Sequence, residues 1–414
     1  MNMRLLIFGD VFSPPAFLPR LRYFCSYFLN KGYDINLIFE KFEGERCVPE
    51  DIPVFSTDYY KYKRGVRAKI EWVFKFLLGL FFDYKGYFFY KKSQQFLSGK
   101  NFDVVFCTSP LTFPLTTAAR VAKKNNIPLF VDLRDIPEQS PDDNYYMAHS
   151  SSGFFGDLIT KIYKRNSLNR RNRVLKMANG VTSVSPFHIQ TLSNYNSNTH
   201  LIYNGFDELK FIPEDVKTDR FTISYFGRVY NEKMRNPGLL FEALKTIGKK
   251  REGILENTVV KWFIDENSKA VIEKMAGEYG LSSLMEYCDF VEPDGLSAEM
   301  NKSSIFLILC NVAAEKRFFG MMTTKFFEAL GTNRPILCIP DNKDNLAQLI
   351  RETNSGLVTS DVLKVESFLL EKFTEWQKTG MTKGLLDETT RMNYSRKQGA
   401  EILENLFINS VKNK

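Results

Sequence analysis

The residues with the clearest chemical potential lie at 317–340, in the run RFFGMMTTKFFEALGTNRPILCIP. Thr323 and Thr324 are residue types that begin helices, and the run that follows carries Lys325 and Glu328. Free N–H groups at a helix start, together with hydroxyls and a lysine, favour anions. A carboxylate one turn further in accepts hydrogen bonds from hydroxyl groups such as those of a ribose. The segment therefore suits a ligand that joins a diphosphate to a polyol, as a nucleotide sugar does.

The same stretch predicts the elements that hold these residues. A helix running from Lys325 to Leu330 would be closed by Gly331 as its C-cap. Residues 336–339 are apolar throughout, which is typical of a strand in a parallel sheet covered on both faces. An ordinary βαβ unit gives the same pattern when Lys325 and Glu328 form a solvated i,i+3 pair. The segment alone leaves both interpretations open.

A second group of candidate anion-binding residues follows a predicted strand in the second half of the chain. Gly227 lets the backbone approach a ligand closely, and Arg228 and Arg235 can each bind phosphate in a bidentate manner. Lys233 adds a point charge to this loop. Doubly wound sheets bind ligands at the carboxyl ends of their strands, where the loop lies. A solvated basic loop is the alternative, and convergence with Lys325 favours the anion site.

Alternating strand and helix patterns run through the chain of 414 residues and restart near its middle. This alternation predicts an α/β protein with two doubly wound parallel sheets. The length also favours two or three domains. We expect an N-terminal domain at residues 1–210, a C-terminal domain at residues 211–391, and a final helix at about residues 394–410.

Together these motifs resemble those of the retaining family-4 glycosyltransferases, of the type that builds bacterial surface polysaccharides. The run that begins at Lys325 is similar to the donor-site helix of the family, K-[LF]-F-E. Residues 178–185 and 202–207 resemble its hinge motif, A-D-x-[IV]-x-x-V-S followed by [IV]-x-N-G-[VF]-D. The resemblance implies the GT-B fold, in which two Rossmann-like domains face a central cleft. A crossover helix, here within residues 392–414, would return to the first domain.

The resemblance also implies roles on the donor side. Glu328 would hold the nucleotide ribose, and Arg228 and Arg235 would act on the diphosphate as catalytic residues. Many family members carry a second glutamate eight positions before the one that matches Glu328, and this chain has Gly320 at that position. We expect backbone N–H groups of residues 319–322 to replace it. The donor-binding residues implied are Gly227, Lys233, Thr323, Thr324, Lys325 and Glu328, with Lys233 as a substitute for the second arginine.

On the acceptor side, the run VDLRD ending at Asp135 resembles the D-x-R-D segment of the polysaccharide subgroup. Asp135 would face the reacting sugar as a catalytic residue, with Asp132 and Arg134 beside it to position an acceptor. An internal Asp–Arg ion pair that ties down a loop is the alternative. Ser109 lies in a turn similar to the TSPP turn of the family, and Arg20 follows a loop similar to F-x-P-P. Both are acceptor-side candidates.

The positive charge of the chain is concentrated in its first half. Residues 1–205 hold 27 Lys and Arg against 17 Asp and Glu, a net +10, whereas the whole chain carries +8. The segment from Tyr59 to Lys92 combines nine basic residues with two acids and thirteen aromatic residues. Such a mixture suits an anionic membrane surface or single-stranded nucleic acid. Its apolar centre favours a helix lying on a membrane over a core helix with basic flanks, and it is too short to span a bilayer.

The remaining composition bounds the cofactors and the compartment. Six cysteines without metal-type spacing and three histidines give no reason to expect a metal, and buried free thiols fit a reducing cytosol. His188 and His200 are expected at the surface. No signal peptide is evident, so we expect a cytoplasmic protein, either free or at the inner face of the cytoplasmic membrane.

The expected function is retaining, metal-independent transfer of a sugar, without a cofactor, from a nucleoside diphosphate sugar to a saccharide acceptor. The basic, aromatic first domain favours a lipid-linked acceptor, as in capsule or O-antigen synthesis. The expected partners are the nucleotide sugar, the acceptor and the membrane surface, and nucleic acid is not among them. Two alternatives stay open: a nucleotide-sugar epimerase of the same fold, and a basic nucleic-acid-binding protein, which would leave Glu328 unexplained.

Overall fold

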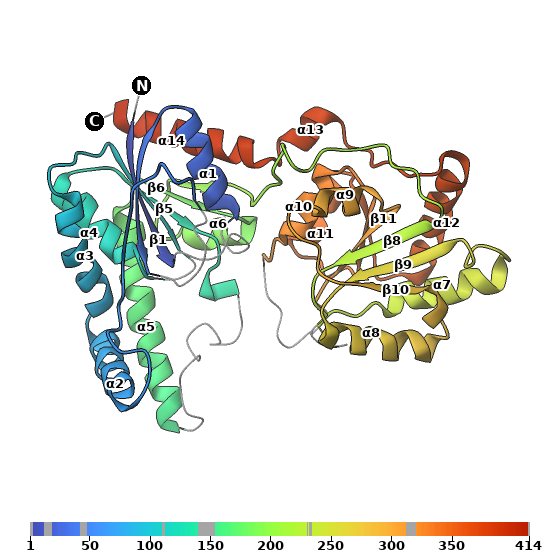
Figure 1. Cartoon of the computed structure of the whole chain (residues 1–414), viewed down its shortest axis with the longest axis horizontal. Helices are drawn as coiled ribbons and strands as arrows, with labels where there is room; N and C mark the ends of the chain where they lie inside the picture. Colours follow the sequence, from blue (N-terminus) through green and yellow to red (C-terminus); the bar gives the residue numbers. More distant parts are fainter. Residues whose placement is uncertain are drawn as a thin grey trace. The chain divides into compact units, whose positions relative to one another are not determined.

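The computed structural model describes residues 3–11, 19–41, 48–109, 112–139, 154–229, 231, 234–311 and 320–412, without the side chains of residues 10, 11, 154 and 155. The chain divides into two compact units. Unit 1 consists of Met1–Tyr203 together with Gly399–Lys414, and unit 2 consists of Asn204–Gln398. Each unit is built on one parallel sheet with helices on both faces (Figure 1).

The sheet of unit 1 has seven strands in the order β3-β2-β1-β4-β5-β6-β7. The strand β1 lies at the point where the order reverses, since Leu5 is in register with Ile35 of β2 on one side and with Val104 of β4 on the other. These central strands are buried on both faces, as their continuous apolar runs predict. The strands are β1 (Arg4–Val11), β2 (Asp34–Glu40), β3 (Val54–Thr57), β4 (Val104–Ser109), β5 (Leu129–Leu133), β6 (Gly180–Ser183) and β7 (Thr199–Leu201).

Two layers of helices cover this sheet. The helices α1 and α14 pack on one face, and α4 and α5 contribute to the core on the other, with α3 alongside α4 (Figure 1). A 3₁₀ turn at Pro137–Gln139 follows β5. The helices are α1 (Pro19–Asn30), α2 (Val66–Phe81), α3 (Tyr84–Leu97), α4 (Leu115–Asn125), α5 (Phe154–Met177), α6 (Pro186–Leu192) and α14 (Arg396–Lys412).

The C-terminal helix α14 belongs mainly to unit 1, as the predicted crossover helix requires. Its Phe407 is fully buried, and its ring lies 5.7 Å from that of Phe28, 5.7 Å from that of Phe106 and 5.0 Å from that of Phe130. Burial of aromatic area at this contact holds the end of the chain on the first sheet.

The sheet of unit 2 has six strands in the order β10-β9-β8-β11-β12-β13. Three phenylalanine rings stack across its centre: Phe226 of β8 is 4.3 Å from Phe263 of β9 and 5.5 Å from Phe306 of β11, with near-parallel planes. The strands are β8 (Phe221–Phe226), β9 (Thr258–Phe263), β10 (Met285–Cys288), β11 (Ile305–Leu309), β12 (Ile336–Ile339) and β13 (Gly356–Val358).

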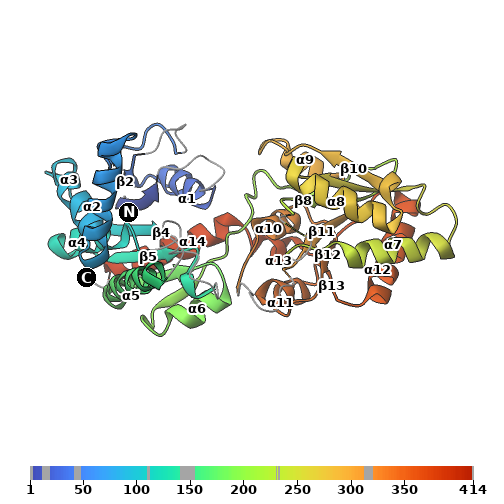
Figure 2. The same ribbon diagram turned by 90° about the horizontal axis from the view of Figure 1, so that it is seen from below.

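Helices cover both faces of this sheet as well. The helices α7, α8 and α12 pack around Trp262 in the larger core, while α10 and α11 lie on the other side (Figures 1 and 2). The helices are α7 (Gly238–Lys250), α8 (Glu266–Tyr279), α9 (Leu296–Asn301), α10 (Thr324–Gly331), α11 (Asn345–Glu352), α12 (Val362–Thr379) and α13 (Glu388–Met392), with a 3₁₀ turn at Ser282–Leu284. The predicted fold class, two doubly wound parallel sheets and a C-terminal crossover helix, is thus confirmed.

One predicted helix boundary is wrong. Gly331 lies inside α10 and is not its C-cap; Thr332 takes that place, and Asn333 adopts the left-handed conformation with φ of 49°. Close packing explains the glycine. A Cβ on Gly331 would lie 2.6 Å from Phe211 Cβ and 2.8 Å from the ring of Phe206.

No helix among the described residues is long and apolar enough to cross a membrane.

Candidate functional site

The strand order of unit 2 has a switch point between β8 and β11. The chain passes from β8 to β9 on one side of this point and from β11 to β12 on the other side. Open α/β sheets bind ligands at such switch points. The loop after β8 and the segment between β11 and α10 both carry predicted donor residues. Because the strands are parallel, both segments begin at the same edge of the sheet.

The loop after β8 is held by its own arginine. Gly227 has φ of 148° and donates its N–H to the carbonyl of Phe263 at 3.2 Å. Arg235 Nη1 donates to the carbonyl oxygen of Arg228 at 2.7 Å and contacts the Tyr225 hydroxyl at 3.0 Å. The same hydroxyl donates to the Arg228 carbonyl at 2.9 Å. Arg235 therefore positions the backbone that presents Arg228.

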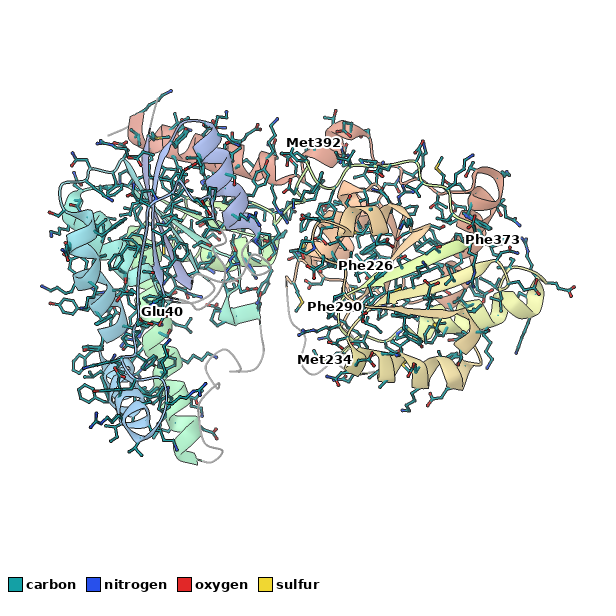
Figure 3. All side chains as sticks on the ribbon, in the orientation of Figure 1. Glu40, Phe226, Met234, Phe290, Phe373 and Met392 are labelled. Atoms are coloured by element: carbon teal, nitrogen blue, oxygen red, sulfur yellow. The ribbon has the colours of Figure 1, made fainter. Side chains whose placement is uncertain are left out.

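The side chain of Arg228, unlike that of Arg235, makes its contacts outside this loop. Its side chain is 59% exposed, and its Nε lies 3.1 Å from Oδ2 of Asp265. Asp265 caps α8 by accepting the N–H of Ser268 at 2.9 Å. Hydrogen bonds from the side chain and the backbone of Ser268, with a smaller contribution from Arg228, lower the pKa of the Asp265 carboxyl. The ring of Phe290, half exposed, lies 5.9 Å from the Arg228 guanidinium carbon (Figure 3). A cation between a carboxylate and an aromatic ring is oriented and still accessible.

Sequence reasoning missed Asp265 as the partner of Arg228. The pattern of an aspartate directly after a strand and three positions before a serine is the signal that could have identified it. Lys233, the substitute candidate in this loop, lies outside the described residues.

The second half of the donor set lies at the start of α10. Thr323 is the N-cap, and its hydroxyl accepts the N–H of Lys325 at 3.4 Å, while Thr324 is the first helical residue. Lys325 Nζ lies 2.9 Å from Oε2 of Glu328. Glu328 is only 8% exposed, whereas the Lys325 side chain is 31% exposed, so the pair is partly buried. Burying a carboxylate with one lysine costs desolvation energy, which a purely structural surface pair avoids.

The position of the missing glutamate has a different structure from the one expected. Gly320 has φ of 66°, in the left-handed region, and its N–H donates to both carboxylate oxygens of Asp344 at 3.0 Å. This N–H is therefore engaged within the protein instead of being available to a transferred sugar. Phe319, the preceding residue of the expected set, lies outside the described residues.

In unit 1, two acceptor-side candidates are buried against each other. Arg20 Nη2 lies 3.0 Å from Oδ1 of Asp132, and the residues are 3% and 2% exposed. Arg20 also donates to the carbonyl of Ile202 at 2.7 Å, and Asp132 accepts from the hydroxyls of Thr108 and Thr182. An internal Asp–Arg pair is thus present, but the partner of Asp132 is Arg20 and not the neighbouring Arg134. These contacts bind both side chains into the protein interior.

Ser109 is also fully buried, and its hydroxyl donates to the carbonyl of Phe113 at 2.5 Å. Arg134 is partly buried. The segment resembling F-x-P-P lies outside the described residues. Three of the acceptor-side candidates, Arg20, Asp132 and Ser109, are therefore buried and hydrogen-bonded within unit 1.

Asp135 is exposed and is the end of a buried hydrogen-bonded chain. Its Oδ1 accepts from Gln139 Nε2 at 3.2 Å, and Gln139 Oε1 lies 2.7 Å from Nε2 of His188. His188 Nδ1 lies 3.0 Å from the hydroxyl of Ser183, which donates to the carbonyl of Leu133. The surface position expected for His188 is wrong, because the residue is 1% exposed. A buried imidazole needs hydrogen-bond partners, and here Ser183 of β6 and Gln139 of the 3₁₀ turn after β5 supply them.

The predicted site residues fall into two groups, one in each unit. Unit 2 brings Gly227, Arg228 and Arg235 together after β8 and joins Lys325 to Glu328 on α10. In unit 1, Asp135 lies just after β5 and is held there by its hydrogen bond from Gln139. Among the described residues, no group of three or more His, Cys, Asp or Glu side chains could hold a metal ion.

Solved structures of similar fold cover nearly the whole chain. Sucrose-phosphate synthase from Thermosynechococcus elongatus matches with a TM-score of 0.65 and 12% identity, over 99% of this chain and 100% of that one. Anabaena HepE in complex with UDP matches with a TM-score of 0.63 and 12% identity, over 98% and 100%. The lipopolysaccharide outer core galactosyltransferase WaaB matches with a TM-score of 0.55 and 11% identity, over 99% and 100%.

No protein-family profile matches the sequence, and no curated protein does. At identities this low, similarity establishes the fold alone: the chain has the GT-B fold of these glycosyltransferases.

Proposed function

We propose that the protein is a retaining glycosyltransferase of the family-4 type, which moves a sugar from a nucleoside diphosphate sugar to a saccharide acceptor. The observation that carries the proposal is the partly buried Lys325–Glu328 pair at the start of α10, a helix that follows β11, the strand next to the one that leads into the arginine loop. The pair supplies a cation and a hydroxyl acceptor at one helix end. Anabaena HepE, of similar fold, has been crystallised with UDP and with UDP-glucose, which supports a donor of this class.

In this proposal each donor residue acts on a defined part of the nucleotide sugar. Arg228, Lys325 and the N-terminus of α10 stabilise the negative charge that gathers on the leaving diphosphate. Arg235 orients the loop and adds its own charge. Glu328 accepts hydrogen bonds from the ribose hydroxyls. These cations supply the positive charge at the diphosphate, so the proposal includes no metal and no cofactor.

On the acceptor side, Asp135 faces the reacting sugar, and its carboxylate stabilises the positive charge that develops at the anomeric carbon. The acceptor hydroxyl attacks from the face that the leaving diphosphate vacates. A diphosphate oxygen takes the acceptor proton, and the C–O bond forms as the bond to the diphosphate breaks. This sequence retains the anomeric configuration.

We further propose a lipid-linked saccharide as the acceptor, in the assembly of a bacterial surface polysaccharide such as a capsule or O-antigen. The similar fold of a lipopolysaccharide galactosyltransferase is compatible with this role. The exposed apolar residues of α2 and the basic residues around them support contact with the inner face of the cytoplasmic membrane.

A panel of nucleotide sugars tests the proposal. Thermal shift with UDP-, GDP-, CMP- and dTDP-sugars should reveal at least one stabilising donor, because binding to the folded state raises Tm. That donor should then be incubated alone and with a saccharide acceptor. Transfer with retained anomeric configuration supports the proposal. An epimer formed from the donor alone, or no stabilising donor at all, contradicts it.

A further inference from the structure

Unit 1 contains a cavity of about 890 Å³ that none of the roles above uses. It is lined by the segment between β3 and α2, by the first turns of α2, and by Glu40 and Lys41 at the end of β2. Glu40 is labelled in Figure 3. A volume of this size fits a ligand larger than a single phosphate.

The cavity wall is held in place by one carboxylate on α2. Glu71 accepts the backbone N–H of Lys61 at 3.0 Å and that of Tyr62 at 2.9 Å, and it pairs with Lys75 at 2.7 Å. Lys75 also donates to the carbonyl of Tyr59 and lies 4.5 Å from the centre of its ring. The segment before α2 is thereby tied to the helix, and these contacts fix the shape of the cavity wall.

Aromatic side chains provide much of the lining. Tyr59, Tyr60 and Tyr62 come from the segment before α2, and Trp72 comes from the helix itself. Trp72 stacks on Phe76 with ring centroids 5.3 Å apart and planes 8° apart. Tyrosine and tryptophan offer an apolar face and a polar tip, a combination that suits an amphiphilic ligand.

The charge of the lining is positive. Its two acids already have basic partners, since Asp58 lies 3.6 Å from Lys41 and Glu40 lies 2.5 Å from Lys85. Lys63, Arg64 and Lys69 add three further cations to the wall. Such an excess favours an anionic group, and arginine with lysine is a common combination for phosphate.

An exposed apolar stripe on α2 continues from the cavity. Val73 lines the cavity and is 48% exposed. The residues on its side of the helix are also exposed, whereas the opposite side packs against α5, where Phe76 lies 6.1 Å from Tyr163. The stripe consists of Val66, Ile70, Val73, Phe74, Leu77 and Phe81, at helical spacing.

We propose that this cavity binds the phosphate and adjoining sugar of a lipid-linked saccharide, whose apolar chain continues along the exposed stripe of α2. The inference rests on the proposed function, in which this ligand is the acceptor. The lining combines cations for the phosphate with aromatic faces for the sugar, and the apolar stripe that includes Val73 of the lining offers a surface to the hydrocarbon chain that such a molecule carries on its phosphate. A nucleic acid would leave the stripe without a partner.

Calorimetric titration with farnesyl diphospho-N-acetylglucosamine, a lipid-linked saccharide short enough for solution work, tests the proposal. Inorganic diphosphate, farnesol and dihexanoyl phosphatidylglycerol are titrated alongside. Binding of the first probe at least about tenfold tighter than any of the three supports the inference. Equal binding of dihexanoyl phosphatidylglycerol would identify a site for membrane phospholipid only, and absence of probe binding would also overturn it.

Variants locate the binding. Arg64→Ala combined with Lys69→Ala should lower the affinity for the probe by about tenfold or more, because two phosphate contacts are lost. Lys123→Ala combined with Lys124→Ala removes the same charge from α4, outside the cavity, and should leave the affinity unchanged. Equal weakening in both double variants would contradict a local site. Circular dichroism checks that each variant is folded.

The donor experiment separates this inference from the proposed function. If a nucleotide sugar stabilises the protein and is transferred to a soluble saccharide while the lipid-linked probe fails to bind, the cavity assignment falls and the proposed function stands. If the probe binds and no nucleotide sugar does, the proposed function falls.

Discussion

The N–H of Gly320 donates to both carboxylate oxygens of Asp344, at 3.0 Å each. This pair joins the segment before α10 to the N-cap of α11, at the position where the resemblance to family-4 glycosyltransferases led us to expect a glutamate. Gly320 is in the left-handed region, with φ of 66°. A simple glycine-to-glutamate replacement would therefore strain the backbone instead of restoring the motif.

The conformation of Gly320 predicts the effect of adding a side chain there. Gly320→Ala should destabilise unit 2 by about 1–2 kcal/mol, because L-residues pay this cost in the left-handed region. Tm should fall by about 2–4 °C for each kcal/mol in a unit of this size. Gly277→Ala is the control, since Gly277 lies in α8 and its added Cβ would meet only Ser282 Oγ at 3.9 Å. An unchanged Tm for Gly320→Ala would contradict the strained conformation.

Glu328 should matter for donor binding more than for folding. Glu328→Gln keeps the shape of the side chain and removes the charge that faces Lys325 and the proposed ribose. We expect kcat/KM for transfer to fall by about 10- to 100-fold, the range for a lost hydrogen bond to a charged group. Glu299→Gln, which breaks an exposed i,i+3 pair with Lys302, is the matched control. Equal activity of Glu328→Gln and the unsubstituted protein would refute the ribose role.

Replacement of Arg228 should affect UDP binding alone, whereas replacement of Arg235 should also affect the order of the loop. Arg228→Ala removes an exposed cation and should raise the Kd for UDP by about tenfold or more while leaving Tm unchanged. Arg235→Lys keeps the charge but cannot reproduce the guanidinium contacts with the Arg228 carbonyl and the Tyr225 hydroxyl. It should raise the Kd and also loosen the loop, seen as faster amide exchange at residues 227–229. Arg251→Ala, at the end of α7, should change neither quantity.

The buried chain behind Asp135 predicts a stability effect in unit 1. His188→Ala leaves Gln139 Oε1 and the Ser183 hydroxyl without the imidazole, at a cost of about 1–3 kcal/mol for an unsatisfied buried group. Urea denaturation measures this loss. His200→Ala is the control, since His200 is more exposed and contacts Asn198 near the surface. Equal midpoints for the two variants would show that the chain does not stabilise the unit.

Glu71 predicts a pH-dependent change at the cavity. Its hydrogen bond from Lys75, followed by those from the backbone of Lys61 and Tyr62, lowers its pKa from 4.5 to about 2. A depressed carboxyl pKa stabilises the folded form above the unfolded value, so this contribution declines as the pH falls from 4.5 and is lost below about 2. The fluorescence of Trp72, with both other tryptophans replaced by Phe, should report loosening in that window.

Glu71→Gln is the control for this titration. It should show a loosened segment already at neutral pH and no acid transition with this pKa. An acid transition of the same midpoint in the Gln variant would assign it to another group.

Several features could be predicted from sequence because they depend on near neighbours. The apolar runs of the central strands predict a parallel sheet covered on both faces, and the threonines before α10 predict where that helix begins. Residues that follow a strand directly, such as Arg228 and Asp135, could be assigned to a sheet edge for the same reason. The helix boundary near Gly331 could not be predicted in this way. Glycine is required there because Phe206 and Phe211, which are far away in the chain, pack closely against it.

By itself, then, the sequence determined the two α/β units and the edge at which each candidate group emerges, and it predicted the kind of ligand that those groups suit. Only the tertiary structure decided which side chains meet. Asp132 pairs with Arg20 across 112 positions, Gln139 meets His188 across 49, and Asp344 binds Gly320 across 24. Such pairs depend on strand order and on which loops leave the same edge of a sheet. Local propensity carries no information on either, because it reflects only the residues within a few positions along the chain.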